Sequence, residues 1–137
     1  MNGINTLTDN KVLFDTNIII YYFNGIIDDK QIDKMLKESF NISIITKIEF
    51  LSWHKLLENK ALKQKAKAFI SHANVFALTN EIAEKVIDIR QQYRTKTPDA
   101  IIGATALTYG FNIVTNNIND FKNLNLEIFS CDTILST

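Results

Sequence analysis

The sequence has little of several features that mark common classes of protein. Its 137 residues include 15 basic and 15 acidic side chains, and this zero net charge argues against a globally basic nucleic-acid-binding protein. Cys131 has no second cysteine to pair with, so packing must hold the fold, as expected in a reducing cytoplasm. Four glycines and one proline mark no internal linker. We therefore predict one domain over residues 1–137, with residues 1–10 as a short leader.

Long apolar runs are also absent. Residues 18–23 form the most apolar stretch, and Asn24 closes it well short of the roughly 18 residues that a membrane span needs. The first ten residues contain neither a basic side chain nor an apolar run, so they do not resemble a secretory signal. Because 46% of the residues are apolar and 10% are aromatic, the chain can build a core. These features predict a soluble, cytoplasmic protein.

Short apolar runs alternate with amphipathic helical patterns along the chain. The runs predict strands at residues 11–15, 41–45, 75–78, 111–115 and 126–129. The helical patterns cover residues 16–24, 28–40, 46–57, 62–70, 79–93 and 97–109. Thr79 and Pro98 are typical helix starts, and Gly110 is a typical stop. Strands separated by helices predict an α/β fold with a central parallel five-stranded sheet flanked by helices on both faces.

Four acidic residues lie near the predicted carboxyl ends of the strands, which is where parallel sheets bind their ligands. Asp15 ends the first strand, and Glu49 lies four residues after the second. Asp99 opens the helix before the fourth strand, and Asp120 follows that strand. The chain order therefore brings four carboxylates to one edge of the sheet.

Each acid also has a local explanation at a helix end. Thr46 and Glu49 fit the Thr-x-x-Glu capping box, Asp99 lies in a first helical turn, and Asp15 can cap the helix that follows it. As a group, however, ionised carboxylates a few ångströms apart repel one another unless a cation lies between them. An oxygen-only set favours Mg²⁺ or Mn²⁺, whereas Zn²⁺ would call for His or Cys ligands. Phosphate chemistry is the natural use of such a site.

Four short motifs occur between residues 11 and 130. They are Val12-Leu13-Phe14-Asp15-Thr16-Asn17, Ile45-Thr46-x-x-Glu49-Phe50, Pro98-Asp99-Ala100-x-x-x-Ala104 and Val114-Thr115-Asn116-Asn117-x-x-Asp120-Phe121. In this order and spacing they resemble the PIN-domain ribonucleases of the VapC toxin type. The resemblance implies a Mg²⁺- or Mn²⁺-dependent endoribonuclease that acts on tRNA or another structured RNA. It also implies the toxin half of a toxin–antitoxin pair, a homodimer silenced by a small antitoxin protein.

The resemblance assigns roles to the residues of these motifs. Asp15 and Asp99 match the principal metal ligands, and Glu49 matches a third acid that binds metal or orients the attacking water. Many PIN domains have an aspartate directly after the threonine of the fourth strand, where this chain has Asn116. The fourth position of the site therefore falls to either Asn116 or Asp120. The supporting hydrogen-bonding residues would be Asn17, Thr115 and Asn116.

Other groups of residues have a functional and a structural interpretation. Three lysines on one helical face could contact an RNA backbone, although solvated faces of this kind are more common: Lys60, Lys63 and Lys67. Four aromatic residues could stack on bases or seat an antitoxin helix, but we favour core or dimer packing: Tyr21, Tyr22, Phe23 and Trp53. His54 and His72 lie outside the four motifs and are predicted to be surface or structural residues.

Three alternatives compete with the toxin hypothesis. A PIN-fold nuclease could process RNA outside any toxin system. A phosphoacceptor receiver domain also places aspartates and a threonine around Mg²⁺. A Glu inside the helix after the second strand and the lack of a Lys at the end of the fifth strand count against it. A silent binding module would lack one of the acids. Without the four acids, 15 basic residues face 11 acidic ones, so neutrality does not exclude an RNA substrate.

Overall fold

The computed structural model describes residues 11–27 and 30–130. Its centre is a five-stranded sheet, made of β1 (Val12–Phe14), β2 (Asn41–Ser43), β3 (Asn74–Phe76), β4 (Asn112–Val114) and β5 (Ile128–Phe129). The strands lie in the order β3-β2-β1-β4-β5 and all pairs are parallel, as predicted. The predicted leader, Cys131 and the start of the predicted helix at residue 28 lie outside the described residues.

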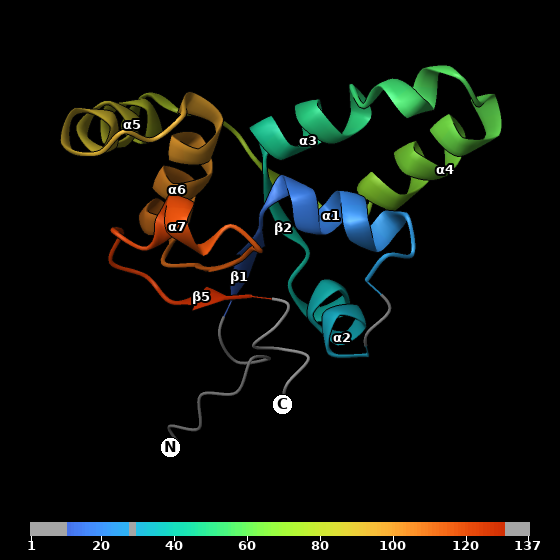
Figure 1. Cartoon of the computed structure of the whole chain (residues 1–137), viewed down its shortest axis with the longest axis horizontal. Helices are drawn as coiled ribbons and strands as arrows, with labels where there is room; N and C mark the ends of the chain where they lie inside the picture. Colours follow the sequence, from blue (N-terminus) through green and yellow to red (C-terminus); the bar gives the residue numbers. More distant parts are fainter. Residues whose placement is uncertain (1–10, 28–29, 131–137) are drawn as a thin grey trace.

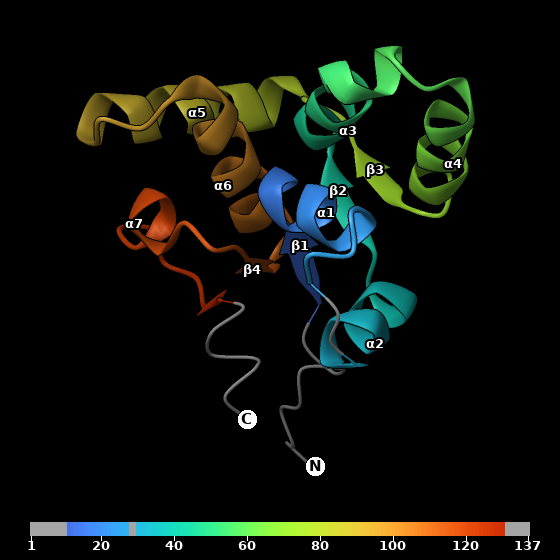
Figure 2. The ribbon, with the colours of Figure 1, turned by 45° about the vertical axis from the view of Figure 1, so that its right-hand side comes forward.

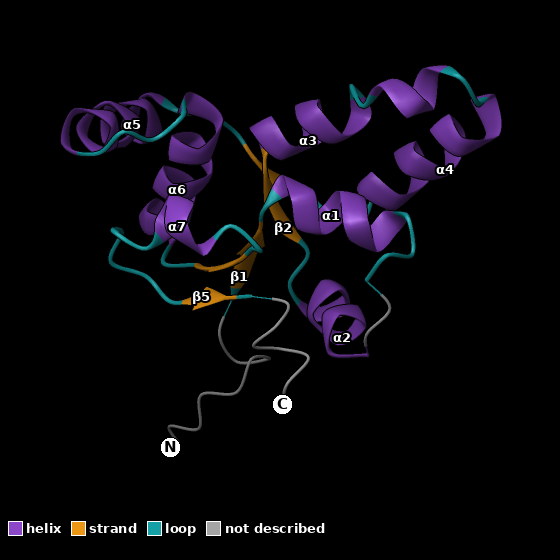
Figure 3. Ribbon diagram, in the orientation of Figure 1, coloured by secondary structure: helices purple, strands orange, loops and turns teal. Residues whose placement is uncertain are grey.

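Helices connect the strands and cover the sheet (Figures 1 and 3). They are α1 (Thr16–Phe23), α2 (Lys30–Glu38), α3 (Ile44–Leu51), the 3₁₀ turn η1 (His54–Leu57), α4 (Lys60–Ile70), α5 (Asn80–Gln92), α6 (Thr97–Tyr109) and α7 (Ile118–Phe121). None of the helices in the described residues is long and apolar enough to cross a membrane.

The alternation of side chains along β1 explains why helices occupy both faces of the sheet. Val12 and Phe14 point into one core, where side chains of α1, α2 and α4 pack. Leu13 points the other way, into a core that includes Ile102 of α6 and Phe121 of α7. All of these side chains are almost fully buried. Figure 2 shows the consequence, with α6 and α7 on one side of β1 and α1, α2 and α4 on the other.

The second strand is shorter than predicted. β2 ends at Ser43, because the Ser43 hydroxyl accepts the Ile45 N–H at 3.1 Å and caps α3. The helix therefore begins at Ile44, and the prediction that Thr46 opens it is wrong. α3 then ends at Leu51, so the predicted continuous helix to Leu57 is interrupted before η1. An apolar run of this length suits a buried strand and a buried helix equally well, so the boundary could not be read from the pattern.

The predicted helix ends at Thr79, Pro98 and Gly110 agree with the structure to within a residue, whereas α2 ends and α4 begins two residues earlier than predicted. The Thr79 hydroxyl accepts the Ile82 N–H at 3.2 Å and caps α5. Gly110 ends α6 with a φ of 71°, a left-handed conformation that glycine adopts without steric cost. Pro98 is the second residue of α6 rather than the first, since Thr97 begins that helix. β3 begins one residue earlier and ends two residues earlier than the predicted strand.

Candidate active site

Asp15 lies at the carboxyl end of the central strand, at the point where β1 passes into α1. Its Oδ1 accepts the N–H of Thr16 at 2.8 Å, so it caps α1 as predicted. Its Oδ2 accepts the hydroxyl of Thr115 at 2.7 Å, directly after the neighbouring strand β4. Asp15 is only 3% exposed, and Thr115 is completely buried. The carboxylate is therefore fixed in orientation from two adjacent strands.

Thr115 also orders the turn that leads to α7. Its hydroxyl accepts the N–H of Asn117 at 2.9 Å while donating to Asp15. One buried side chain thus couples the position of Asp15 to the loop that carries Asn116 and Asp120. These hydrogen bonds are the contacts expected of a residue that supports a metal ligand, and that role of Thr115 stays a prediction.

A second chain of hydrogen bonds joins α1 to α3. The Thr16 hydroxyl donates to Glu49 Oε1 at 2.7 Å and lies 2.9 Å from the Thr46 hydroxyl. Because a hydroxyl has only one proton, Thr46 must donate to Thr16 when the Glu49 carboxylate is ionised. The Glu49 carboxylate is thus held by Thr16, which belongs to the first motif. The capping box that the Thr46-x-x-Glu49 pattern suggested does not form, because Ser43 caps α3. Sequence reasoning missed the Thr46 contact, although its spacing of three residues from Glu49 places both on one helical face.

The remaining two acids come from the other side of the sheet. Asp99 is half-buried in the first turn of α6, as predicted. Asp120 lies in the short helix α7 and is exposed, and the buried Phe121 beside it anchors that helix. The charges of Asp120, Asp15 and Glu49 all act on Asp99, so the four acids lie near one another. We call Asp15, Glu49, Asp99 and Asp120 the acid cluster.

Mutual repulsion connects the four members of the acid cluster. Burial raises the pKa of Asp15 above its ordinary value, and the charges of Glu49 and Asp120 raise it further. Hydrogen bonds from Thr115 and Thr16 oppose that rise in the pKa of Asp15. Burial is also the largest reason that the pKa of Asp99 rises to about 6, and the next is the charge of Asp120. The predicted convergence of negative charge on this edge is therefore present.

The donor chemistry of the acid cluster fits a hard divalent cation. All of its donors are carboxylate oxygens, and the two hydrogen bonds to Asp15 leave lone pairs on that carboxylate for a further ligand. Within residues 11–27 and 30–130, no three His, Cys, Asp or Glu side chains stand in position to share one ion. A common ion would therefore need the less buried acids to turn inward, as is frequent when catalytic groups meet their ligands.

The other predicted site residues lie outside the acid cluster. Asn17 and Asn116 are exposed, beside Thr16 and Thr115. Lys60, Lys63 and Lys67 lie on α4, whose buried side chains pack into the core of α1 and α2, so their contact with RNA stays a prediction. The cation whose charge lowers the pKa of Asp99 is instead Lys96, which the sequence reasoning did not single out. Its position, three residues before Asp99, was the available signal.

The aromatic and histidine residues outside the motifs have structural positions. Tyr21, Tyr22, Phe23 and Trp53 pack against the core of α1, α2 and α4, as favoured from the sequence. His54 and His72 are exposed.

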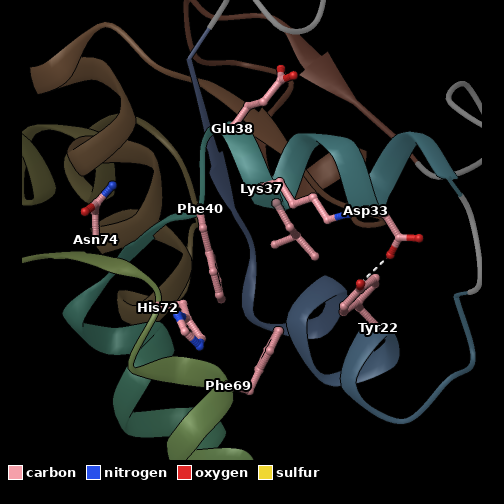
Figure 4. Close-up of a pocket in the computed structure, with 9 residues that line it drawn as sticks. Tyr22, Asp33, Lys37, Glu38, Phe40, Phe69, His72 and Asn74 are labelled. Atoms are coloured by element: carbon pink, nitrogen blue, oxygen red, sulfur yellow. Dashed lines mark hydrogen bonds between the residues drawn. The ribbon is translucent and has the colours of Figure 1, made fainter.

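A hollow of about 450 Å³ opens between α1, α2 and the end of α4, and Figure 4 shows its lining. Tyr22, Phe40 and Phe69 point into it, and Tyr22 donates a hydrogen bond to Asp33. We call it the aromatic hollow. Phe40 and Asn74 border it just before β2 and at the start of β3, so it lies at the amino edge of the sheet, opposite the acid cluster. It contains no member of the acid cluster.

A parallel α/β sheet with carboxylates gathered beyond the ends of its central strands defines the class of this protein. The family model of the PIN domain matches residues 12–126, most of the chain. The chain therefore belongs to the PIN domain family. This membership decides against the receiver-domain alternative.

Individual relatives extend the comparison. Ribonuclease VapC1 of Rickettsia felis is 27% identical to this chain, over 87% of this chain and 95% of that protein. A toxin–antitoxin complex from Klebsiella pneumoniae contains a chain 31% identical to this one, with a TM-score of 0.69 over 84% of this chain and 93% of that chain. The DNA-bound VapBC of Salmonella typhimurium has a TM-score of 0.76 at 23% identity, covering 88% and 98%, which shows a shared fold.

Proposed function

We propose that this protein is a metal-dependent endoribonuclease that hydrolyses phosphodiester bonds of tRNA or another structured RNA. The observation that carries the proposal is the buried carboxylate of Asp15, held by Thr115 and Thr16 beside three further acids. The similarity to Ribonuclease VapC1 supports RNA as the substrate class. Because such RNA is found inside the cell, the proposal also places the protein in the cytoplasm.

Mg²⁺ or Mn²⁺ is the cofactor that we propose, as PIN-domain ribonucleases of the VapC type generally use a divalent metal. Asp15 and Asp99 would be its principal ligands, with Glu49 and either Asp120 or Asn116 completing the site. When bound, the ion would neutralise the phosphate oxygens and lower the pKa of a coordinated water. The raised pKa values of Asp15 and Asp99 support this assignment, because a cation would favour the ionised carboxylates that burial, and then the neighbouring charges, disfavour.

The side chains of the cluster divide the remaining work. In the proposed hydrolysis, a water oxygen forms a bond to phosphorus while the bond from phosphorus to one ribose oxygen breaks. Glu49 would take the proton of the attacking water through its Oε2, because the Thr16 hydroxyl already donates to its Oε1. Asp15 would keep its ligand atoms fixed, because each of its two carboxylate oxygens accepts a hydrogen bond.

Purified protein, structured RNA and a choice of Mg²⁺, Mn²⁺ or chelator test the nuclease proposal. We expect cleavage with either metal and none with chelator. Asp99→Asn should abolish cleavage, whereas Glu58→Gln, which alters an exposed acid after η1, should leave it unchanged. Cleavage that persists in chelator, or an Asp99→Asn variant with full activity, would contradict the mechanism.

The biological part of the proposal is that the protein is the toxin of a toxin–antitoxin pair, a homodimer that a small antitoxin protein silences. The 31% identical chain in the Klebsiella pneumoniae toxin–antitoxin complex supports this role. Expression should arrest growth, and Asp99→Asn should remove the effect. Harmless expression of protein that cleaves RNA in vitro would refute the toxin role.

A further inference from the structure

A polar hollow lies directly beside the acid cluster, between the connection from α5 to α6 and the helix α7. Its volume is about 250 Å³. Tyr93 and Arg94 line it from one side, and Asn119, Asn123 and Leu124 line it from the other. Asp120 belongs both to this lining and to the acid cluster. A group bound in this hollow, which we call the side hollow, would therefore be the immediate neighbour of whatever lies at the acids.

The side hollow presents hydrogen-bonding groups that the fold does not use. In the described part of the chain, the side chains of Arg94, Asn119 and Asn123 have no hydrogen bond or ion pair, and all three are exposed. A carboxamide offers a donor and an acceptor side by side, which matches the polar edge of a nucleobase. A guanidinium matches a phosphate group. These groups point to a nucleotide as the ligand.

The size and walls of the side hollow suit a single base. A volume of about 250 Å³ lies below the roughly 300–1,000 Å³ of pockets that enclose drug-sized ligands. Tyr93 and Leu124 are half-buried and pack against the core between α5 and α6, so they form firm apolar walls. A flat ring between such walls gains from stacking, while its edge meets the two amides.

A second hollow continues away from the acids. It measures about 260 Å³ and shares Tyr93, Asn123 and Leu124 with the side hollow, and it extends to Lys85 and Gln92 on α5. The acid cluster, the side hollow and the second hollow form a path with polar walls. Arg94 and Asp120 line the side hollow, and Lys85 and Asp88 line the second hollow. Such a path suits successive unpaired nucleotides. A paired strand would keep its bases inside the duplex and could not offer them to either hollow.

We propose that the side hollow binds one unpaired base of the RNA, immediately next to the bond that is cleaved at the acid cluster. Asn119 and Asn123 contact the edge of the base, and Arg94 holds an adjoining phosphate. This inference rests on the proposed ribonuclease function and deepens it by assigning one base-binding subsite, with its residues, beside the acid cluster. The three side chains are positioning residues that determine specificity.

An abasic substitution tests the inference. A short single-stranded RNA with a mapped cleavage site is compared with the same RNA lacking one base next to that site, and with its duplex. With the wild-type protein, we expect the missing base to raise KM about tenfold and the duplex to resist cleavage. The double variant Asn119→Ala, Asn123→Ala should raise KM for the intact RNA by a similar factor and should not respond further to the missing base.

The matched control for this double variant is Gln91→Ala, an exposed amide on α5 that lines neither hollow. It should keep the wild-type KM and the full penalty for the missing base. If the missing base raised KM equally for the wild-type protein and the double variant, the inference would be overturned. Efficient cleavage of the duplex would overturn it too. The ribonuclease proposal would stand in both cases. Failure of the wild-type protein to cleave any RNA with metal would overturn both.

Arg94 has its own control in Lys122, another exposed cation, which lies at the end of α7 and outside the side hollow. Arg94→Ala should raise KM about tenfold with little change in kcat, because the interaction positions the substrate. Lys122→Ala should change KM less than twofold. Equal effects of the two variants would mean that only overall charge matters, and would overturn the assignment of Arg94.

Discussion

The two edges of the sheet differ in what their side chains do for the fold. At the carboxyl edge, burial and like charges raise the pKa values of Asp15 and Asp99, so the ionised cluster opposes folding. At the amino edge, the ring of Phe69 lies 5.1 Å from that of Phe40 and 5.9 Å from that of Tyr22, and these contacts favour folding. The proposed catalytic role and the stabilising role thus lie at opposite ends of the same strands. Variants at the two edges should therefore show opposite effects on activity and stability.

Asp15→Asn should give the largest effect. Asparagine caps a helix as well as aspartate does, and the Thr115 hydroxyl can turn to accept from its amide, so α1 should be retained. The loss of a principal ligand should lower RNA cleavage by about 10³-fold, which cleavage assays with Mg²⁺ can measure. The metal-free variant should be at least as stable as the wild type in urea unfolding, because a repelling charge is gone. A variant that unfolds easily would contradict the division between the two edges.

Phe69→Ala should have the opposite effect. The ring packs against Tyr22, Phe23, Phe40 and Phe50, so its removal should lower the free energy of unfolding by about 3 kcal/mol. Urea unfolding monitored by circular dichroism measures this loss. Below the temperature of unfolding, kcat should remain within about twofold of the wild type, because no atom of the acid cluster is touched. A large fall in kcat of the folded variant would show that the amino edge also affects catalysis, and would contradict the separation of the two edges.

Thr115→Val sharpens the comparison within the carboxyl edge. It removes the hydroxyl that holds Asp15 and the Asn117 N–H, while keeping the shape of the side chain. We expect activity to fall about 10- to 100-fold, as for other groups that orient a metal ligand. The matched control is Thr108→Val, since that hydroxyl bonds only the Ala104 carbonyl of its own helix. Equal activities of the two variants would show that Thr115 has no positioning role.

The smallest expected effect is the dependence of metal-free stability on pH. The folded pKa of Asp99, about 6, lies above its ordinary value of 3.8, so the folded protein binds the proton more tightly. This contribution to stability is complete below pH 3.8 and is lost as the pH rises through 6. After allowance for solvent screening it amounts to about 1 kcal/mol. Urea unfolding in chelator should show this dependence, and Asp99→Asn should make the fall in stability between pH 3.8 and 6 smaller, with the remainder coming from Asp15.

Much of the site was accessible from chain order. Asp15 and Asp120 follow predicted strands, and parallel strands place their carboxyl ends together, so the convergence of acids could be predicted without coordinates. The role of Glu49 was harder to read. The Thr46–Glu49 pattern fits a capping box, and only the contacts of Thr46 and Glu49 with Thr16 reveal that these side chains serve another element.

The sequence by itself determined the class of fold and the residues that carry its negative charge. The reason is that periodicity and strand order are local properties, which survive in the chain without its partners. The tertiary structure alone decided which hydroxyl holds Asp15, because Thr115 is 100 residues away and reaches it only when β4 pairs with β1. It also decided that Ser43 rather than Thr46 caps α3. Finally, it decided that a hollow lies beside the acids, between α7 and the loop that precedes α6. These features depend on packing between distant segments, which no local pattern specifies.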